Sequence, residues 1–308
     1  MRNFIIYPFL FLSILMYSQE VKFGKITQEE LEEKIHPIDS TADAAYLYKK
    51  RRTYFEYDPH KGFIVIDEYH ERVKIYTKEG FDYATKKISY YDPESGSKER
   101  ISDLKAYTFN LESGKIDKQK VASKDIFEEK ISKYRTLKKI SFPSVKEGSV
   151  IELKYKRIIP YWEIPSLVFQ HNIPVNNLDY QVKIPEYFIF NKRSKGYYSI
   201  PVKEEKSSES IDYTTKERSS GNGLITSVKT TFTNNRHNYI SNIYIIQKEN
   251  IPAMKDNEPY SGHINNYRGG MEFELSGTRF PNSMYKDYSA TWTMFVNKSI
   301  NPLILVNN

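Results

Sequence analysis

Apolar and polar residues alternate along several stretches of the chain, a pattern that predicts extended strands. In the stretch from Phe63 to Ile75, the apolar residues Val65, Tyr69 and Val73 fall on one side. The other side carries Glu68, His70, Arg72 and Lys74. Since one side is apolar and the other charged, we expect a long antiparallel strand that buries one side and turns the other to solvent.

The same period of two recurs at 107–111, 151–155, 180–184, 224–232 and 271–275. Turn residues separate these stretches, as at Glu112-Ser113-Gly114 and before Gly148. One short helix is predicted after Thr27, where Glu30 completes a capping box. Residues 123–133 fit either a short helix or an irregular strand. We therefore predict an all-β fold, an antiparallel β-sandwich with immunoglobulin-like sheets, as one unit or as two packed β subdomains with few short helices.

Proline-rich and polar stretches mark the expected boundaries between segments of the chain. We expect a signal peptide at 1–18, a β-sandwich domain at 19–290 and a different segment at 291–308. Pro160, Pro165 and Pro174 mark a candidate internal boundary near 160–175, at an edge or a crossing between sheets. The polar stretch Lys203 to Gly223 is expected to form exposed hairpin loops.

The amino terminus has the layout of a secretory signal peptide. Arg2 precedes the uncharged run Phe4 to Met16, and Ser18 supplies the small residue at the cut. The run is shorter than the roughly 20 residues that span a bilayer, so we expect no integral membrane span after cleavage. The predicted location is exported: periplasmic, cell-surface or secreted. The chain has 0 cysteines, which excludes disulfides and every thiol mechanism.

The formal net charge of +7 is spread along the 308 residues. A nucleic-acid partner would require the excess to be gathered on one face, so no nucleic-acid binding is expected. The only run of four basic residues is Lys49-Lys50-Arg51-Arg52, which is expected to form a solvated face. We predict a protein, peptide or glycan at the cell surface as the partner.

No catalytic or metal motif is present. The 6 histidines have no ligand spacing, and neither a serine-hydrolase elbow nor a phosphate loop occurs. Glu272 and Glu274 share a strand face but are typical of the wet side of a sheet. We therefore predict no catalytic residues, no metal site and no cofactor.

Tyr161 and Trp162 are the best candidates for a binding surface, because such side chains combine contact area with a polar group. Their flanking prolines also favour a second interpretation, in which the two aromatic side chains fill the seam between two sheets. Both interpretations stay open at this point.

Three longer segments resemble a known family: "SFPSVKEGSVIELKYKR" (141–157), "FQHNIPVNNLDYQVKIPEYF" (169–188) and "NIPAMKDNEPYSGHINNYRGGMEFELSG" (250–277). They are similar to the N-terminal domain of unknown function in exported bacterial transglutaminase-like proteins. The likeness extends from about residue 43 to about residue 282. The matching residues belong to turns and strands, so the resemblance implies a β-sandwich and no catalytic residue.

The resemblance also implies a neighbour, a papain-like domain with Cys, His and Asp. Thr291-Trp292 matches the start of that domain's first helix, and Pro302 would end the helix. We therefore expect 291–308 to be a truncated or diverged start of a missing transglutaminase-like domain. The predicted function is a non-catalytic, exported module that binds or positions a partner domain. A glycan- or peptide-binding module and a truncated enzyme fragment are the alternatives.

Overall fold

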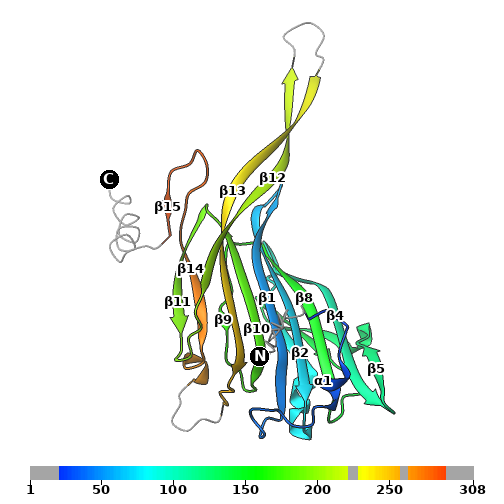
Figure 1. Ribbon diagram of the computed structural model, residues 1–308. Coiled ribbons are helices and arrows are strands. Elements are labelled where there is room, and N and C mark those ends of the chain that lie inside the picture. The colour runs from blue at the N-terminus through cyan, green and yellow to red at the C-terminus, as the bar shows by residue number, and fades with distance from the viewer. Residues whose placement is uncertain (1–20, 221–227, 257–262, 289–308) are drawn as a thin grey trace, which may run out of the picture.

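The computed structural model describes residues 21–220, 228–256 and 263–288, and these residues confirm the predicted all-β class. The strands of the largest sheet are β1 (Ala44–Asp58), β2 (Gly62–Ile75), β4 (Arg100–Glu112), β5 (Lys115–Lys120), β8 (Val150–Ile159), β10 (Val175–Pro185), β12 (Lys203–Ser220) and β13 (Val228–Ile251). They lie in the order β12-β13-β10-β1-β2-β8-β4-β5 (Figure 1). Neighbours are antiparallel except β1 and β10, which run parallel.

Two smaller sheets accompany the large one. A four-stranded sheet contains β9 (Leu167–Val168), β11 (Phe188–Lys195), β14 (Gly270–Thr278) and β15 (Lys286–Asp287). A three-stranded sheet contains β3 (Thr85–Tyr91), β6 (Ile126–Ser132) and β7 (Arg135–Ser141). The segment 123–133 is therefore a single 3-10 turn, η2 (Ser123–Asp125), followed by strand β6.

The helical segments are short: α1 (Gln28–Glu32), η1 (Lys78–Ala84), η2 and η3 (Ile264–Asn266). The predicted capping box is present, since the Thr27 side chain accepts from the Glu30 backbone N–H at 3.2 Å and the Glu30 carboxylate accepts from the Thr27 N–H at 2.9 Å. In the ranges that the structure describes, no helix has the length and apolar character needed to cross a membrane.

One hydrophobic core joins all three sheets. It includes Val65 and Val182 from the large sheet, Ile140 from the three-stranded sheet, and Phe188 and Phe273 from the four-stranded sheet. Between β8 of the large sheet and β10 of the same sheet, the proline-rich segment forms β9, which pairs with β14. Of the two expected alternatives, an edge or a crossing between sheets, this segment forms the crossing, and the internal boundary near 160–175 stays a prediction.

The predicted hairpin at Glu112 also forms. Two residues, Ser113 and Gly114, connect β4 to β5 with φ values of 50° and 76°. Positive φ at both central positions is what a two-residue hairpin of this type requires, and glycine adopts it without a steric cost.

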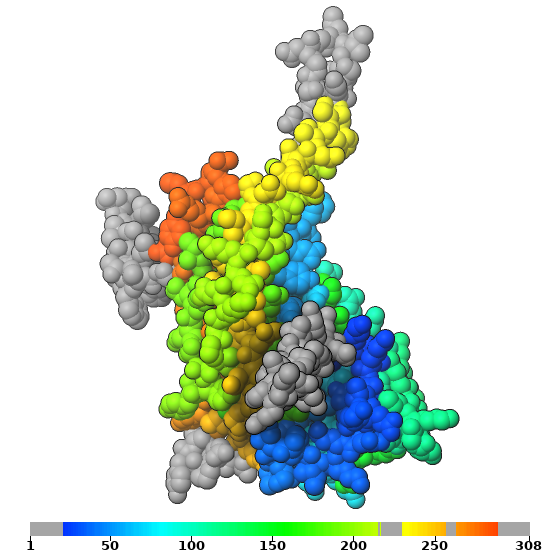
Figure 2. Space-filling view, viewed as in Figure 1, coloured from blue at the N-terminus to red at the C-terminus, as the bar shows by residue number. Residues whose placement is uncertain are grey.

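The prediction of loops at Lys203 to Gly223 was wrong. Residues 203–220 form the long strand β12, which pairs with β13 from Lys203↔Ile245 to Ser220↔Val228. Only residues 241–251 of β13 also pair with β10, so the outer part of the hairpin is a two-stranded ribbon that extends beyond the body (Figure 1, Figure 2). The backbone N–H and C=O groups of β12 pair with β13, so β12 is a strand although its side chains are polar.

Four parts of the chain lie outside the described residues. The predicted signal peptide at 1–18 and the segment 291–308 belong to them, as does the start of the strand predicted at 224–232.

Candidate functional site

The polar side of β2 is buried, which corrects the expectation of a solvent-facing side. Arg72 is 3% exposed and Lys74 is fully buried. The segment from Val21 through α1 supplies the cover, because Arg72 donates to the carbonyl of Lys25 at 2.6 Å and Lys74 donates to the carbonyl of Leu31 at 2.7 Å. The strand is therefore covered on both sides by protein.

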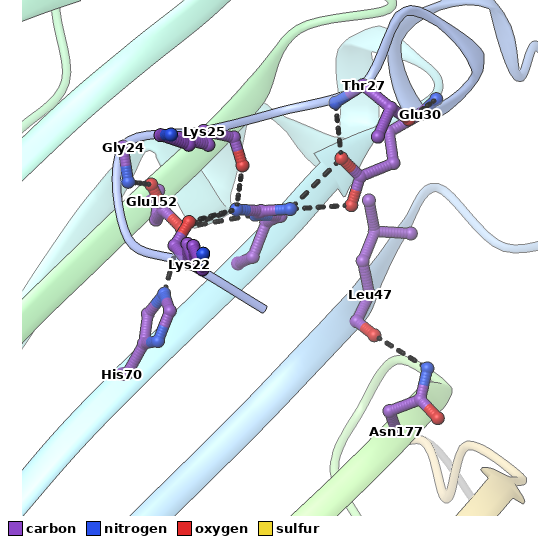
Figure 3. Close-up of polar contacts among 10 residues, drawn as sticks. Lys22, Gly24, Lys25, Thr27, Glu30, Leu47, His70, Glu152 and Asn177 are labelled. Atoms are coloured by element: carbon purple, nitrogen blue, oxygen red, sulfur yellow. Dashed lines mark hydrogen bonds and ion pairs between the residues drawn. The ribbon is translucent and has the colours of Figure 1, made fainter. Parts of the chain in front are cut away.

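Glu152 on β8 organises this covered side. It accepts from Arg72 at 2.7 Å, lies 2.8 Å from His70 Nε2 and accepts from the Gly24 N–H at 2.7 Å. Figure 3 shows Gly24 and His70 directed at Glu152, with Glu30 beyond. Burial alone would raise the pKa of Glu152, but the bonds from His70 and Arg72 lower it. The arrangement ties the N-terminal segment to the sheet.

The opposite side of β2 also carries buried charges, in the middle of the core. Asp67 is fully buried and accepts from Arg51 at 2.7 Å on both oxygens and from Thr53 Oγ1 at 2.7 Å. Tyr69 donates to the same carboxylate at 2.6 Å. Each lone pair of the carboxylate is thus used, which is the condition for burying an ion pair without a large cost.

The basic run in β1 therefore does not form the predicted solvated face. Lys49 and Arg51 are 6% and 4% exposed and point into the interior, and only their neighbours Lys50 and Arg52 lie on the other side of the strand. Because successive side chains of a strand point to opposite faces, two of the four basic residues face the interior and the other two face the opposite side of the sheet. Arg52 forms an ion pair with Asp179 at 2.5 Å.

A cleft of about 630 Å³ opens beside the second buried acid, Glu71. We call it the β3 cleft, because Thr85, Lys86 and Lys87 of β3 border it. Its apolar walls include Val73 of β2, Phe81 of η1, Phe142 directly after β7, and Ile151 and Leu153 of β8. Apolar walls with a few convergent polar groups are typical of ligand sites.

Two lysines neutralise Glu71 at the cleft. Lys49 Nζ lies 2.5 Å from one carboxylate oxygen, and Lys86 bonds the other. Burial alone would raise the pKa of Glu71, but the two ammonium groups outweigh it and hold the pKa well below its usual range. The pKa of Lys86 is raised, because attraction to Glu71 exceeds the effect of burial. The two ion pairs therefore favour the ionised carboxylate and hold it in place.

His171 lies behind the cleft, with its ring 5.1 Å from that of Tyr46, a cleft residue. Burial lowers the pKa of His171 well below its usual value. Its Nε2 atom is buried and has no hydrogen-bond partner in the described part of the chain. Burial thus favours the neutral imidazole, and its Nε2 atom is a buried polar atom without a partner among the described residues.

Tyr161 and Trp162 lie at the seam between sheets. The Trp162 indole N–H donates to the Phe63 carbonyl at 2.9 Å, and its ring lies 5.1 Å from that of Phe188. Tyr161 Oη donates to Glu99 at 3.1 Å. Both side chains pack against the core and use their polar groups internally. Their role in binding a glycan or peptide stays a prediction.

The sequence argument missed the buried acids Asp67 and Glu71. Both occupy the apolar phase of β2, and their cationic partners Lys49 and Arg51 occupy the same phase of β1. Where two consecutive strands carry charges of opposite sign at positions expected to face the core, the sequence indicates buried ion pairs between them. In the ranges 21–220, 228–256 and 263–288, no group of three or more His, Cys, Asp or Glu side chains could hold a metal ion.

The match to a protein family covers residues 66–220. The family is described as "Domain of Unknown Function with solved-structure structure (DUF3857)". The chain therefore belongs to the DUF3857 family, whose matched region contains most of β2, all of β3 to β11, and β12.

One solved structure gives a comparison of the fold. It is a crystal structure from Parabacteroides distasonis ATCC 8503 described as "a putative protease", with a TM-score of 0.50 and 15% identity. The likeness covers 75% of this chain and 40% of that one, so this chain spans less than half the length of that protein. At this identity the comparison concerns the fold alone. No match was found among curated proteins.

Proposed function

We propose that this protein is an exported, non-catalytic β-sandwich module that accompanies transglutaminase-like domains and binds a partner at the β3 cleft. The observation that carries the proposal is the state of Glu71. Its carboxylate is neutralised by Lys49 and Lys86 and is part of the fold's own ion-pair arrangement. Such a group presents a fixed, polar surface to a ligand.

The ionisation of the acidic and basic groups near the cleft weighs against acid–base catalysis there. A general base works best when its pKa lies near the operating pH. The pKa values of Glu71 and His171 both lie well below their usual values, for Glu71 because two cations outweigh burial and for His171 because of burial. With 0 cysteines in the chain, a thiol nucleophile is absent as well. These features support binding as the role.

The transglutaminase context of the proposal comes from the motifs at 141–157, 169–188 and 250–277. Among the comparisons, only the greater length of the matched solved protein supports this context. This chain spans 40% of the solved protein that shares its fold, so a similar module is one part of a longer protein there. We infer that the module positions a catalytic neighbour or its substrate.

Turnover measurements on the purified full chain test the proposal. Transamidation of a glutamine peptide by a primary amine and hydrolysis of unstructured peptides should both equal the buffer rate. Turnover of either substrate above the buffer rate would refute the proposal. Glu71→Gln leaves Lys49 and Lys86 without their carboxylate, so a loss of activity in this variant is assigned to the cleft only where urea unfolding shows that the variant is folded.

A further inference from the structure

The outer edge of β3 borders the β3 cleft. Thr85, Lys86 and Lys87 are consecutive, and all three line the cleft. Successive side chains of a strand point to opposite faces. A strand with three successive residues on one cleft therefore presents its edge, rather than one face, to that cleft.

That edge is open where it meets the cleft. Among the described residues, β3 pairs with β7 and with no other strand. The Phe142 N–H donates to the Ala84 carbonyl at 2.9 Å, so Ala84 and residues two apart from it direct their backbone groups at β7. The alternate residues Thr85 and Lys87 direct theirs away from it.

Hydrogen bonds at the far end of the same edge confirm which residues of β3 direct their backbone groups away from β7. Tyr91, which is in the phase of Thr85 and Lys87, directs both backbone groups away from β7: its carbonyl accepts from the Glu99 N–H at 2.9 Å, and its N–H donates to the Glu99 side chain at 2.7 Å. Glu99 thus closes the edge at Tyr91. No described residue closes it at Thr85 and Lys87.

We propose that an extended peptide segment, with apolar residues alternating with acidic ones, binds the β3 cleft by adding a strand to the outer edge of β3. This inference rests on the proposed function. Addition of a strand to an open edge is a recurrent mode of peptide recognition, in which main-chain bonds give affinity and alternate side-chain positions give specificity.

The alternation of the peptide follows from the two sides of β3. The Lys86 side chain points inward to Glu71, so peptide side chains on that side would enter the cleft, whose walls are largely apolar and include Val73, Ile151 and Leu153. The Lys87 side chain is exposed and forms no ion pair with a described residue. Opposite charges on neighbouring strands stabilise pairing, so acidic side chains suit that side.

The experiment uses the full chain and the synthetic peptide acetyl-Glu-Val-Glu-Leu-Glu-Val-amide, followed by NMR. Binding should slow amide exchange at Thr85 and Lys87. Two further peptides carry N-methyl groups at alternate amides. Methylation of the set that faces β3 should weaken binding about tenfold, and methylation of the other set should change it less than about twofold.

Variants of the protein give a second, matched measurement. Lys87→Ala removes the charge and keeps the N–H, and should weaken binding about two- to threefold. Lys87→Pro also removes the N–H, and proline is tolerated where an edge N–H does not bond the neighbouring strand. Lys87→Pro should weaken binding about tenfold more than Lys87→Ala.

Three outcomes would overturn the inference: equal effects of the two methylation sets, a peptide of the same composition with its acids in one block binding equally well, or shifts confined to the surroundings of Tyr161 and Trp162. The last outcome would move binding from the β3 cleft to the seam between sheets and would leave only the non-catalytic character of the proposed function standing. Failure of that role is recognised separately, by turnover in the assays described above.

Discussion

The two sides of β2 are both charged and both buried, but they are buried by different means. On the inner side, Asp67 is neutralised by Arg51 of the neighbouring strand β1, and Glu71 is neutralised by Lys49 of β1 and by Lys86 of β3. On the outer side, Arg72 and Lys74 are covered by the segment from Val21 through α1, which is far away in sequence from β8 and its Glu152. The inner pairs join strands of the sheets to one another, whereas the outer contacts attach the N-terminal segment to the large sheet.

This difference predicts that some substitutions lower the stability of the whole domain and others only that of the N-terminal segment. Loss of an inner partner leaves a charge inside the folded body, so the whole domain should lose stability. Loss of an outer contact exposes a surface that water can reach once the segment moves, so part of the effect should be local. The predictions below test this distinction in order of expected size.

The largest effect is expected for Asp67→Ala. Arg51 would keep its bonds to the carbonyls of Pro165 and Ser166 but lose the carboxylate that pairs with it, and an uncompensated buried charge costs about 3–5 kcal/mol. Urea unfolding measures the loss.

An exposed ion pair provides the control. Asp212 and Arg236 are 2.6 Å apart on the β12–β13 ribbon, and Asp212→Ala should leave the urea midpoint unchanged. Equal losses for Asp67→Ala and Asp212→Ala would contradict the account of the inner side.

The outer side should produce a pH dependence through Lys74. Burial lowers the pKa of Lys74 to about 8, below its ordinary value of about 10.4. Between these two values the unfolded chain binds more protons than the native protein, so the free energy of unfolding should rise with pH, by at most about 3 kcal/mol. Below pH 8 both states hold the proton and the contribution is constant.

Lys74→Met removes the titrating group and should remove this rise. Urea unfolding of both proteins from pH 7 to 10.5 gives the comparison. Parallel pH profiles for the two proteins would show that Lys74 does not titrate in this range.

Glu152→Gln tests the attachment of the N-terminal segment. The change weakens the bonds from Arg72, His70 and the Gly24 N–H, with an expected loss of about 2 kcal/mol. Hydrogen exchange should accelerate at residues 21–33 before it does so in β1. Uniform acceleration across the sheet would contradict a separately attached segment.

The smallest effect is expected for Thr27→Ala, which removes the cap of α1. The cost should be about 1 kcal/mol and confined to exchange within α1. Thr27→Ser is the matched control, because it retains the capping hydroxyl. A shift of the global urea midpoint equal to that of Asp67→Ala would contradict local opening.

The local part of this fold could be predicted from the sequence. Alternation identified the phase of β2, and the turn residues Ser113-Gly114 identified the β4–β5 hairpin. What covers each side could not be predicted in this way. The burial of Arg72 depends on a segment about 50 positions earlier in the chain. The alternation of apolar and polar residues indicates only which residues share a side of the strand.

The β3 cleft was also beyond the sequence argument, for a similar reason. Glu71 is a candidate site residue because Lys49 and Lys86 converge on it from two different sheets. Neither a motif nor a spacing records that convergence. The long ribbon was missed because the polar residues of β12 are typical of loops, while pairing with β13 makes them a strand.

The ionisation of Glu71 tests the central claim most directly, because non-catalytic binding requires a carboxylate fixed by its two lysines. A ¹³C NMR titration of the Glu71 side-chain carboxyl in the wild-type protein gives the answer. We expect a chemical shift that stays constant from pH 8 down to about pH 4, since the pKa lies well below the usual range. A titration midpoint near neutral pH would show a carboxyl suited to proton transfer and would contradict the account.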